Sequence, residues 1–305
     1  MRITDLQYYL ALANYRNFSQ VSDKFGVSQP TISLAMKRLE KEVGAKLIIR
    51  QPAHKNVGLT HSGEVLHQHA SLIVEQYELA LTEIKRNSEQ SLLIGLPPII
   101  QISYFPAIAN VLSDESLAHL KTVEVGAQEA IDQLKNGEID ASFVGYLDDI
   151  DQSEFNLIPF DEQPFAILAA DDYPLAQKGS VSFNELKDEK FILLKGNFVH
   201  NYAFDLLARS AHVQANVLFN SSEPYGILSL IRQNRGIGFM AAHPALTFPG
   251  VTAIPITDKN QPIFKVGFAY RKDLVLTPDQ QKIFDELLAA SQMGRPDHLI
   301  PPMEG

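Results

Sequence analysis

Residues 28–44, SQPTISLAMKRLEKEVG, bring together side chains that can bind DNA. Gln29 carries an amide that can pair with adenine, and the Ser33 hydroxyl can bond to several bases. Lys37 adds a cation that can neutralise a phosphate. These three residues are spaced four apart, so a helix places them on one face. The stretch therefore predicts a helix whose polar face contacts DNA.

Two further helices are expected to position this face. Apolar residues at helical spacing predict a first helix over about 4–15. SQVSDKFG predicts a second, with Ser19 as its N-cap, Val21 and Phe25 inward, and Gly26 at its end. The third then begins with Ser28 as cap and Pro30 in its first turn, with an inward stripe of Ile32, Met36, Leu39 and Val43. Two helices joined by a short turn containing glycine form a helix-turn-helix, whose second helix enters the major groove.

The distribution of charge supports this interpretation. Residues 1–58 hold 9 Lys+Arg against 4 Asp+Glu, whereas residues 91–305 hold 15 against 27, so that the chain as a whole has a net charge of −10. A basic segment on an acidic chain indicates that nucleic acid binds at one end only. The alternative is an amphipathic helix whose charged face is merely solvated.

A hairpin is expected after the third helix. KLII and NVGLT are two β-prone runs on either side of a turn, which predicts a wing. Arg50, His54 and Lys55 would lie at its tip, near a phosphate or the minor groove. The alternative is a surface hairpin without a ligand.

A long helix is predicted over about 60–87, with Thr60 as its cap. Its apolar residues alternate in steps of four and three, which is the a/d seam of about three heptads of coiled coil. Such a seam favours a second copy of the chain, although burial against the chain's own C-terminal domain is the alternative. His67 and His69 point to different faces of this helix, so we expect no metal site. The seam residues are Leu66, Ala70, Ile73, Tyr77, Ala80 and Ile84.

The run FSQVSDKFGVSQPTISLAMKRLEKEVGAKLIIR resembles the winged helix-turn-helix of LysR-type transcriptional regulators. The resemblance covers the whole chain and implies a winged helix-turn-helix at 1–58, a linker helix for dimerisation at 59–90 and a periplasmic-binding-protein-like α/β effector domain at 91–305. That domain would have two lobes, lobe I at about 91–163 and 269–295 and lobe II at about 164–268. One departure is that Leu34 and Ala35 stand where many relatives carry Arg, His or Gln. The predicted DNA-binding residues are Ser28, Gln29, Pro30, Thr31, Ser33, Leu34, Lys37, Arg38, Arg50, His54 and Lys55.

The acidic part of the chain alternates β-like and helical runs, which predicts α/β lobes with mostly parallel sheets. The resemblance implies crossover strands near 163–169 and 265–270. The expected strands are LLIGL, TVEVG, ASFVG, PFAILAA, FILL, GIGFMA and KVGFAY. The expected helices are PAIANVL, EAIDQLKNG, FNELK, YAFDLLARSA, EPYGILSLIRQ and DQQKIFDELLAA.

A ligand cleft is expected where strands end and helix N-termini offer free N–H groups. Segments 97–103, 126–129 and 195–201 fit this rule, and the resemblance implies that they line the effector site. Lys195 and His200 could pair with a carboxylate, which favours an organic acid, while exposed loop charges are the alternative. The predicted effector-binding residues are Pro98, Ile99, Ile100, Gln101, Ala127, Gln128, Lys195, Asn197, Phe198, His200 and Asn201.

Other functions lack support in the sequence. There is no cysteine, P-loop, dinucleotide fingerprint or nucleophile elbow, so we expect no enzyme and no cofactor. The N-terminus does not resemble a signal peptide, and no apolar run approaches the roughly 18 residues of a membrane span. The sequence thus favours a cytoplasmic homodimer or homotetramer that binds operator DNA, a small-molecule effector and RNA polymerase. A solute-binding module without a DNA function is the second hypothesis.

Overall fold

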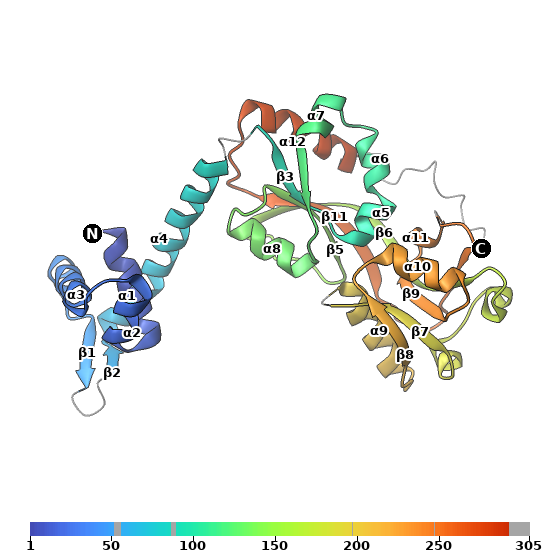
Figure 1. Cartoon of the computed structure of the whole chain (residues 1–305), viewed down its shortest axis with the longest axis horizontal. Helices are drawn as coiled ribbons and strands as arrows, with labels where there is room; N and C mark the ends of the chain where they lie inside the picture. Colours follow the sequence, from blue (N-terminus) through green and yellow to red (C-terminus); the bar gives the residue numbers. More distant parts are fainter. Residues whose placement is uncertain (52–55, 87–89, 197, 247, 293–305) are drawn as a thin grey trace. The chain divides into compact units, whose positions relative to one another are not determined.

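The structure is a computed structural model that describes residues 1–51, 56–86, 90–196, 198–246 and 248–292. The chain divides into two compact units, residues 1–86 and 87–305 (Figure 1). The long helix therefore belongs to the first unit, and the boundaries predicted at 58/59 and 90/91 stay predictions.

The first unit contains the predicted helix-turn-helix. Its second helix begins earlier than expected, because the Asn17 side chain accepts hydrogen bonds from the N–H groups of Ser19 (2.8 Å) and Gln20 (3.3 Å). The prediction of Ser19 as N-cap was therefore wrong. Gly26 ends that helix as predicted, with φ at +63°, a left-handed conformation that glycine adopts without strain. The elements are α1 (Ile3–Tyr15), α2 (Phe18–Phe25), α3 (Gln29–Val43), β1 (Ile48–Gln51), β2 (Asn56–Leu59) and α4 (His61–Arg86).

The core of this unit is built on one stripe of α3. Ile32, Met36 and Leu39 are buried as predicted, and they pack with apolar residues of α1 and α2. Val43 was predicted to be inward but is 41% exposed, because it is the last residue of the helix. Ala35 takes a buried position instead, so the opposite face of α3 is left to solvent.

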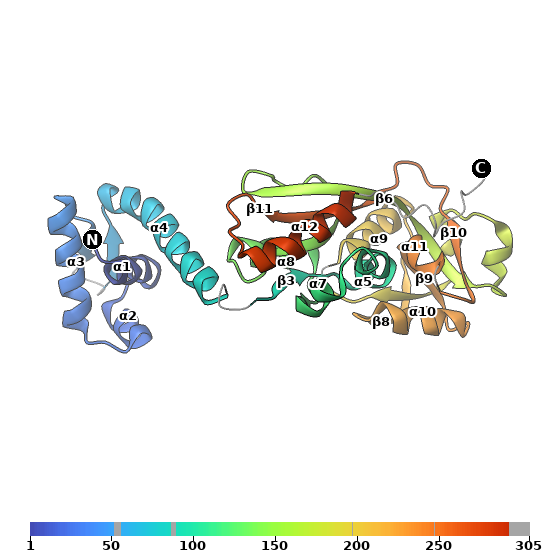
Figure 2. The same ribbon diagram turned by 90° about the horizontal axis from the view of Figure 1, so that it is seen from above.

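The wing and the start of α4 are fixed by close contacts. Strands β1 and β2 pair antiparallel, which confirms the predicted hairpin. The Gly63 N–H donates to the Thr60 hydroxyl (3.0 Å), which confirms the predicted cap. A Cβ on Gly63 would collide with the Leu47 carbonyl, so only glycine allows α4 to approach this closely. Figure 2 shows the C-terminal part of α4 extending beyond the helices α1 to α3.

The second unit is built on a mixed sheet of nine strands in the order β4-β3-β5-β11-β6-β9-β7-β8, with β10 paired to β6. Parallel pairs occur at both ends, but β6 and β11 run antiparallel to their neighbours, so the expectation of mostly parallel sheets was too strong. The strands are β3 (Leu92–Gly95), β4 (Leu120–Val123), β5 (Ala141–Tyr146), β6 (Phe155–Ala170), β7 (Lys190–Leu194), β8 (Asn216–Ser221), β9 (Ile237–Ala241), β10 (Val251–Pro255) and β11 (Ile263–Arg271).

Helices cover this sheet, and several were not predicted. FNELK forms a short 3-10 helix rather than an α-helix. The helices are α5 (Pro98–Ser103), α6 (Phe105–Ala109), α7 (Asp114–His119), α8 (Ala127–Lys135), α9 (Val199–Ser210), α10 (Pro224–Arg232), α11 (His243–Leu246) and α12 (Pro278–Gln292), with 3-10 helices η1 (Pro174–Lys178) and η2 (Phe183–Leu186).

Strand β6 defines two lobes within this unit. Its residues 155–164 pair with β11, and residues 165–170 pair with β9 and β10. The first crossing therefore lies near Pro164, as predicted. Strand β11 begins to pair with β5 at Lys265, within the second crossover that was predicted near 265–270. The lobe boundary predicted at about 269 stays a prediction.

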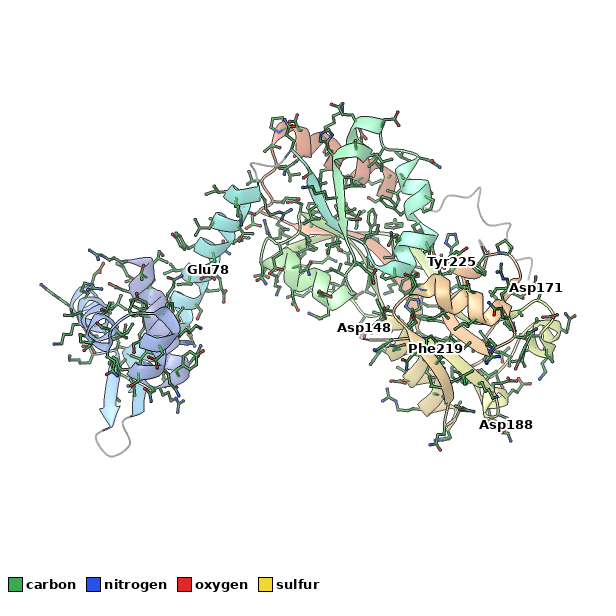
Figure 3. The ribbon with its side chains drawn as sticks, viewed as in Figure 1. Glu78, Asp148, Asp171, Asp188, Phe219 and Tyr225 are labelled. Atoms are coloured by element: carbon green, nitrogen blue, oxygen red, sulfur yellow. The ribbon has the colours of Figure 1, made fainter. Side chains whose placement is uncertain are left out.

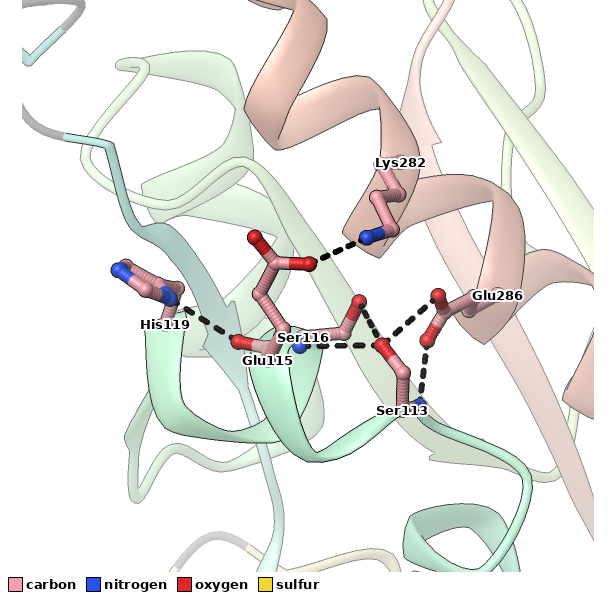
Figure 4. Close-up of polar contacts among 6 residues, drawn as sticks. All are labelled: Ser113, Glu115, Ser116, His119, Lys282 and Glu286. Atoms are coloured by element: carbon pink, nitrogen blue, oxygen red, sulfur yellow. Dashed lines mark hydrogen bonds and ion pairs between the residues drawn. The ribbon is translucent and has the colours of Figure 1, made fainter.

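Helix α12 is bonded to α7 and to the residue before it in lobe I. Glu286 of α12 accepts hydrogen bonds from the Ser113 N–H (2.8 Å) and hydroxyl (3.1 Å), and Lys282 pairs with Glu115 of α7 (2.5 Å) (Figure 4). These bonds hold segment 278–292 against segment 113–119, although the two are far apart in the sequence.

Candidate nucleic-acid interface and effector cleft

The exposed face of α3 contains most of the residues that were predicted to bind DNA. Gln29 and Lys37 are exposed and Ser33 is half-buried on this face. Leu34 is 54% exposed, so its apolar side chain is accessible to an apolar group of a partner. The methyl group of thymine is such a group in the major groove. Ala35 cannot contact a base, because it is buried beneath this face.

Two polar residues at the start of α3 are already hydrogen-bonded. The Gln29 amide donates to the Ser19 hydroxyl of α2 (2.8 Å), which orients its side chain. The hydroxyls of Ser28 and Thr31 bond to each other (2.9 Å), and Ser28 makes no side-chain cap. The amide keeps its second N–H and its carbonyl oxygen, so a two-bond contact between Gln29 and adenine is compatible with the bond to Ser19.

Arg38 is exposed on α3, but its guanidinium pairs with a buried carboxylate of α1. Its guanidinium donates two hydrogen bonds to Asp5, from Nε (2.9 Å) and Nη2 (2.6 Å), and Asp5 is only 3% exposed. The hydrogen bond with Asp5 raises the pKa of Arg38. A buried carboxylate requires such a partner, so Arg38 stabilises the fold in addition to any contact with phosphate. In the described part of the chain Lys37 has no ion pair, so its charge is available.

The wing strands β1 and β2 lie beside the helices, since the Val57 N–H donates to the Arg16 carbonyl (2.9 Å). Of the three predicted wing contacts, His54 and Lys55 fall outside the described residues, as does the side chain of Arg50. Their roles stay predictions.

The predicted dimerisation seam on α4 divides into two parts. Ala70 is buried and Leu66 is half-buried, because both pack into the core of their own unit. Ile73, Tyr77, Ala80 and Ile84 are exposed, with Ile84 at 68%. Leu72 and Leu81 are exposed as well. The surface open to a second copy is therefore the C-terminal part of the seam together with these two leucines.

A cleft of about 760 Å³ lies in the second unit, between α8 and the β5 end on one side and α9 on the other. Four predicted residues line it: Ala127, Gln128, Phe198 and Asn201. They lie where the two helices begin, and neither helix has a side-chain cap. Free N–H groups at both N-termini make this end of the cleft suitable for an anion.

Other predicted effector residues lie elsewhere. Pro98, Ile99 and Ile100 are buried, because the first turn of α5 points into the core of lobe I. Gln101 is exposed but does not line the cleft, and the same holds for Lys195. Asn197 falls outside the described residues.

His200 is a core residue rather than an exposed cation. It is 3% exposed and its ring lies 5.4 Å from that of Phe165 and 4.8 Å from that of Phe264. Burial lowers its pKa to about 3, so the imidazole is neutral near pH 7. The predicted ion pair between His200 and a carboxylate was therefore wrong.

A group of acidic and aromatic residues in the cleft was not predicted from the sequence. The loop after β5, LDDID, contributes its aspartates, and the exposed face of α9 adds further side chains at helical spacing. The rule that ligands bind where strands end applies to β5 as well and would have found this loop. The missed lining residues include Tyr146, Asp148, Asp149, Asp151, Phe155, Tyr202 and Asp205.

A buried polar network holds the junction between the lobes. The Tyr104 hydroxyl donates to Asp161 (2.6 Å), and the Gln163 amide donates to the same carboxylate (2.9 Å). The Gln163 carbonyl accepts from the His243 backbone N–H (3.0 Å). This network therefore connects the junction of α5 and α6 in lobe I with strand β6 and with α11 of lobe II.

A helix-turn-helix with an exposed polar face, carried on the same chain as a two-lobed α/β unit with a cleft, defines a ligand-responsive DNA-binding regulator. Two family models match: "Bacterial regulatory helix-turn-helix protein, lysR family" at residues 3–64 and "LysR substrate binding domain" at residues 85–292. The chain belongs to the LysR family of transcriptional regulators, as the sequence predicted.

Similar curated proteins are regulators of transcription. The malolactic fermentation system transcriptional activator of Lactococcus lactis is 32% identical over 289 residues, which cover 94% of this chain and 98% of that protein. The hydrogen peroxide-inducible genes activator of Haemophilus influenzae is 27% identical, with 89% and 91% covered. Both are named as activators rather than enzymes.

Solved structures share the fold. A full-length OxyR variant from Pseudomonas aeruginosa has a TM-score of 0.53 at 20% identity, covering 100% of this chain and 99% of that chain. The effector binding domain of QuiR in complex with shikimate has a TM-score of 0.54 at 17% identity, covering 67% and 97%. Across the described ranges, we find no helix that is long and apolar enough to cross a membrane.

Proposed function

We propose that this protein is a homo-oligomeric regulator that binds an operator through the exposed face of α3 and the wing, and responds to a small molecule in the cleft. The observation that carries the proposal is the face of α3, where Gln29, Leu34 and Lys37 are presented over a packed core in the segment that matches the family model. The second copy would pair through the exposed apolar residues of α4, which places two recognition helices on two half-sites. Such a regulator acts on the chromosome, in the cytoplasm, together with RNA polymerase.

We also propose that the effector is a small organic molecule with a carboxylate group. The uncapped N-termini of α8 and α9 support this, since their N–H groups face the cleft. The name of the Lactococcus relative, a malolactic fermentation activator, agrees with an organic acid. Oxidation of a thiol is not available as a signal, because the chain has no cysteine.

The experiment starts with selection of bound duplexes from a random pool, followed by fluorescence anisotropy on the enriched duplex and a scrambled one at several salt concentrations. We expect the enriched duplex to bind at least about a thousandfold more tightly. Lys37→Ala should reduce the slope of log affinity against log salt by about 1.8, because a dimer loses two phosphate contacts of about 0.9 each.

Lys187→Ala is the matched control, since it removes the same charge from an exposed position of the second unit. It should leave the slope unchanged. Failure to enrich any duplex would refute the proposed function, and equal slopes for Lys37→Ala and the wild type would remove Lys37 from the interface.

A further inference from the structure

The lining of the cleft is acidic, whereas a ligand whose only charge is a carboxylate would be bound better by a positively charged lining. Its lining contains four aspartates and one lysine, Lys135, which leaves three negative charges in excess. Lys135 is itself paired with Glu154 (3.3 Å). The cleft thus contains no uncommitted cation among the described residues that line it.

Two of the four aspartates are already occupied. Asp151 accepts hydrogen bonds from the N–H (2.9 Å) and hydroxyl (3.0 Å) of Ser153, and Asp149 pairs with Lys265 (3.6 Å). Asp148 and Asp205 have no ion pair or hydrogen bond with any described residue. These two carboxylates are therefore available to a ligand.

Asp148 and Asp205 face the cleft from opposite lobes. Asp148 lies in the loop that follows β5 of lobe I, and Asp205 lies on α9 of lobe II, one turn after Tyr202. Each lobe also adds aromatic rings to the lining, Tyr146 from lobe I and Tyr202 from lobe II. Carboxylates repel each other across an empty cleft, whereas a cation between them is attracted by both and by the faces of the rings.

The lining also includes the starts of two helices. Ala127 and Gln128 are the first residues of α8, Phe198 and Val199 lie at the start of α9, and both helices are long enough to present a positive N-terminus. An anionic group fits at these N-termini, and a cationic group fits at the aspartates.

We propose that the effector is zwitterionic, a molecule of the amino-acid class whose carboxylate binds at the N-termini of α8 and α9 and whose protonated amine binds between Asp148 and Asp205. The inference rests on the proposed function, because it names the ligand of that same cleft. The cavity and the family's effector domain establish the site, and the charges of its lining select the ligand. Binding of the amine replaces repulsion between the two carboxylates by attraction, and so favours an arrangement in which the lobes lie closer together.

The test compares ligands that differ only in the amine. Full-length protein is titrated calorimetrically with each of the proteinogenic amino acids and with the 2-hydroxy acid of the same carbon skeleton, for example aspartate against malate and phenylalanine against phenyllactate. We expect at least one amino acid to bind at least about tenfold more tightly than its hydroxy acid, which corresponds to one ion pair of about 1.4 kcal/mol.

Asp148→Asn and Asp205→Asn should each weaken that binding at least about tenfold, while Asp188→Asn, an exposed control, should leave it unchanged. Asp148 and Asp188 lie well apart in Figure 3. A hydroxy acid that binds equally or more tightly overturns the proposal, as does binding that is unchanged in both variants or a panel in which no amino acid binds. Operator binding without ligand, measured on the same samples, tests the proposed function separately.

Discussion

His200 gives the sharpest quantitative prediction, because its burial makes folding dependent on pH. The ring lies between Phe165 and Phe264, and burial lowers its pKa from 6.5 to about 3. As the pH falls below 6.5 the unfolded chain binds a proton that the folded chain excludes, so stability is present above 6.5 and is lost progressively toward pH 3. Between about pH 7.5 and pH 5.5, protonation of this histidine in the unfolded chain lowers the free energy of unfolding by about 1.4 kcal/mol.

The perturbation is His200→Phe, which keeps an aromatic ring between the two phenylalanines but cannot bind a proton. The free energy of unfolding of the second unit is measured by urea titration at both pH values. Tyrosine fluorescence reports the transition, since the chain has no tryptophan. On going from the higher to the lower pH, the wild type should lose about 1.4 kcal/mol more of its free energy of unfolding than the variant does.

His119→Gln is the control, because His119 is exposed in the same unit. It should retain the pH dependence of the wild type. A wild type and a His200→Phe variant that lose stability in parallel on acidification would refute the assignment of His200 as a neutral core residue.

Three further predictions concern the first unit. Arg38→Ala should lower the melting temperature of this unit by several degrees, because Asp5 stays buried without a partner. Asp5→Asn with Arg38→Gln should recover stability, whereas an unchanged melting temperature in Arg38→Ala would refute the role of this pair. Weak DNA binding by a stable double variant would show that Arg38 contacts phosphate as well. Gln29→Ala should reduce discrimination between the enriched and scrambled duplexes by about 1–3 kcal/mol. Ser19→Ala, which removes only the hydrogen-bond partner of Gln29, should preserve this discrimination. An equal loss of affinity for both duplexes would make Gln29 a contact of the DNA backbone. Ile84→Glu should dissociate the oligomer in sedimentation. Glu75→Lys, a control at an exposed position on the side of α4 away from the seam, should leave it intact. An oligomer that stays intact in both variants would exclude the seam.

The helix-turn-helix was predictable because its determinants are local. The inward spacing of Ile32, Met36 and Leu39 and the glycine at position 26 specify the helices within about 25 residues of chain. The errors were also local in origin. Asn17 and Ser19 are both good N-caps, and only the hydrogen bonds of Asn17 decide between them.

The second unit was harder because its determinants are distant in sequence. His200 and Lys195 look alike as polar residues of one loop, yet Phe165 and Phe264, from two other strands, bury only the histidine. Strand β8 was missed because Val217, Leu218 and Phe219 are all exposed at the edge of the sheet, so the strand shows no alternation of apolar and polar residues. Phe219 is labelled in Figure 3.

The junction between the lobes constrains how a ligand in the cleft can act. Tyr104, Asp161 and Gln163 are buried and bonded to one another, and leaving such groups without partners is costly. The bond from the His243 N–H to Gln163 joins the two lobes, so an opening motion either breaks it or pivots about the crossing segments near Pro164 and Ile263. The lobes should therefore exchange between discrete arrangements. A ligand shifts the populations of two such arrangements only by the ratio of its affinities for them. The two carboxylates that we propose to bind its amine, Asp148 and Asp205, line the cleft from opposing lobes and can supply that difference in affinity.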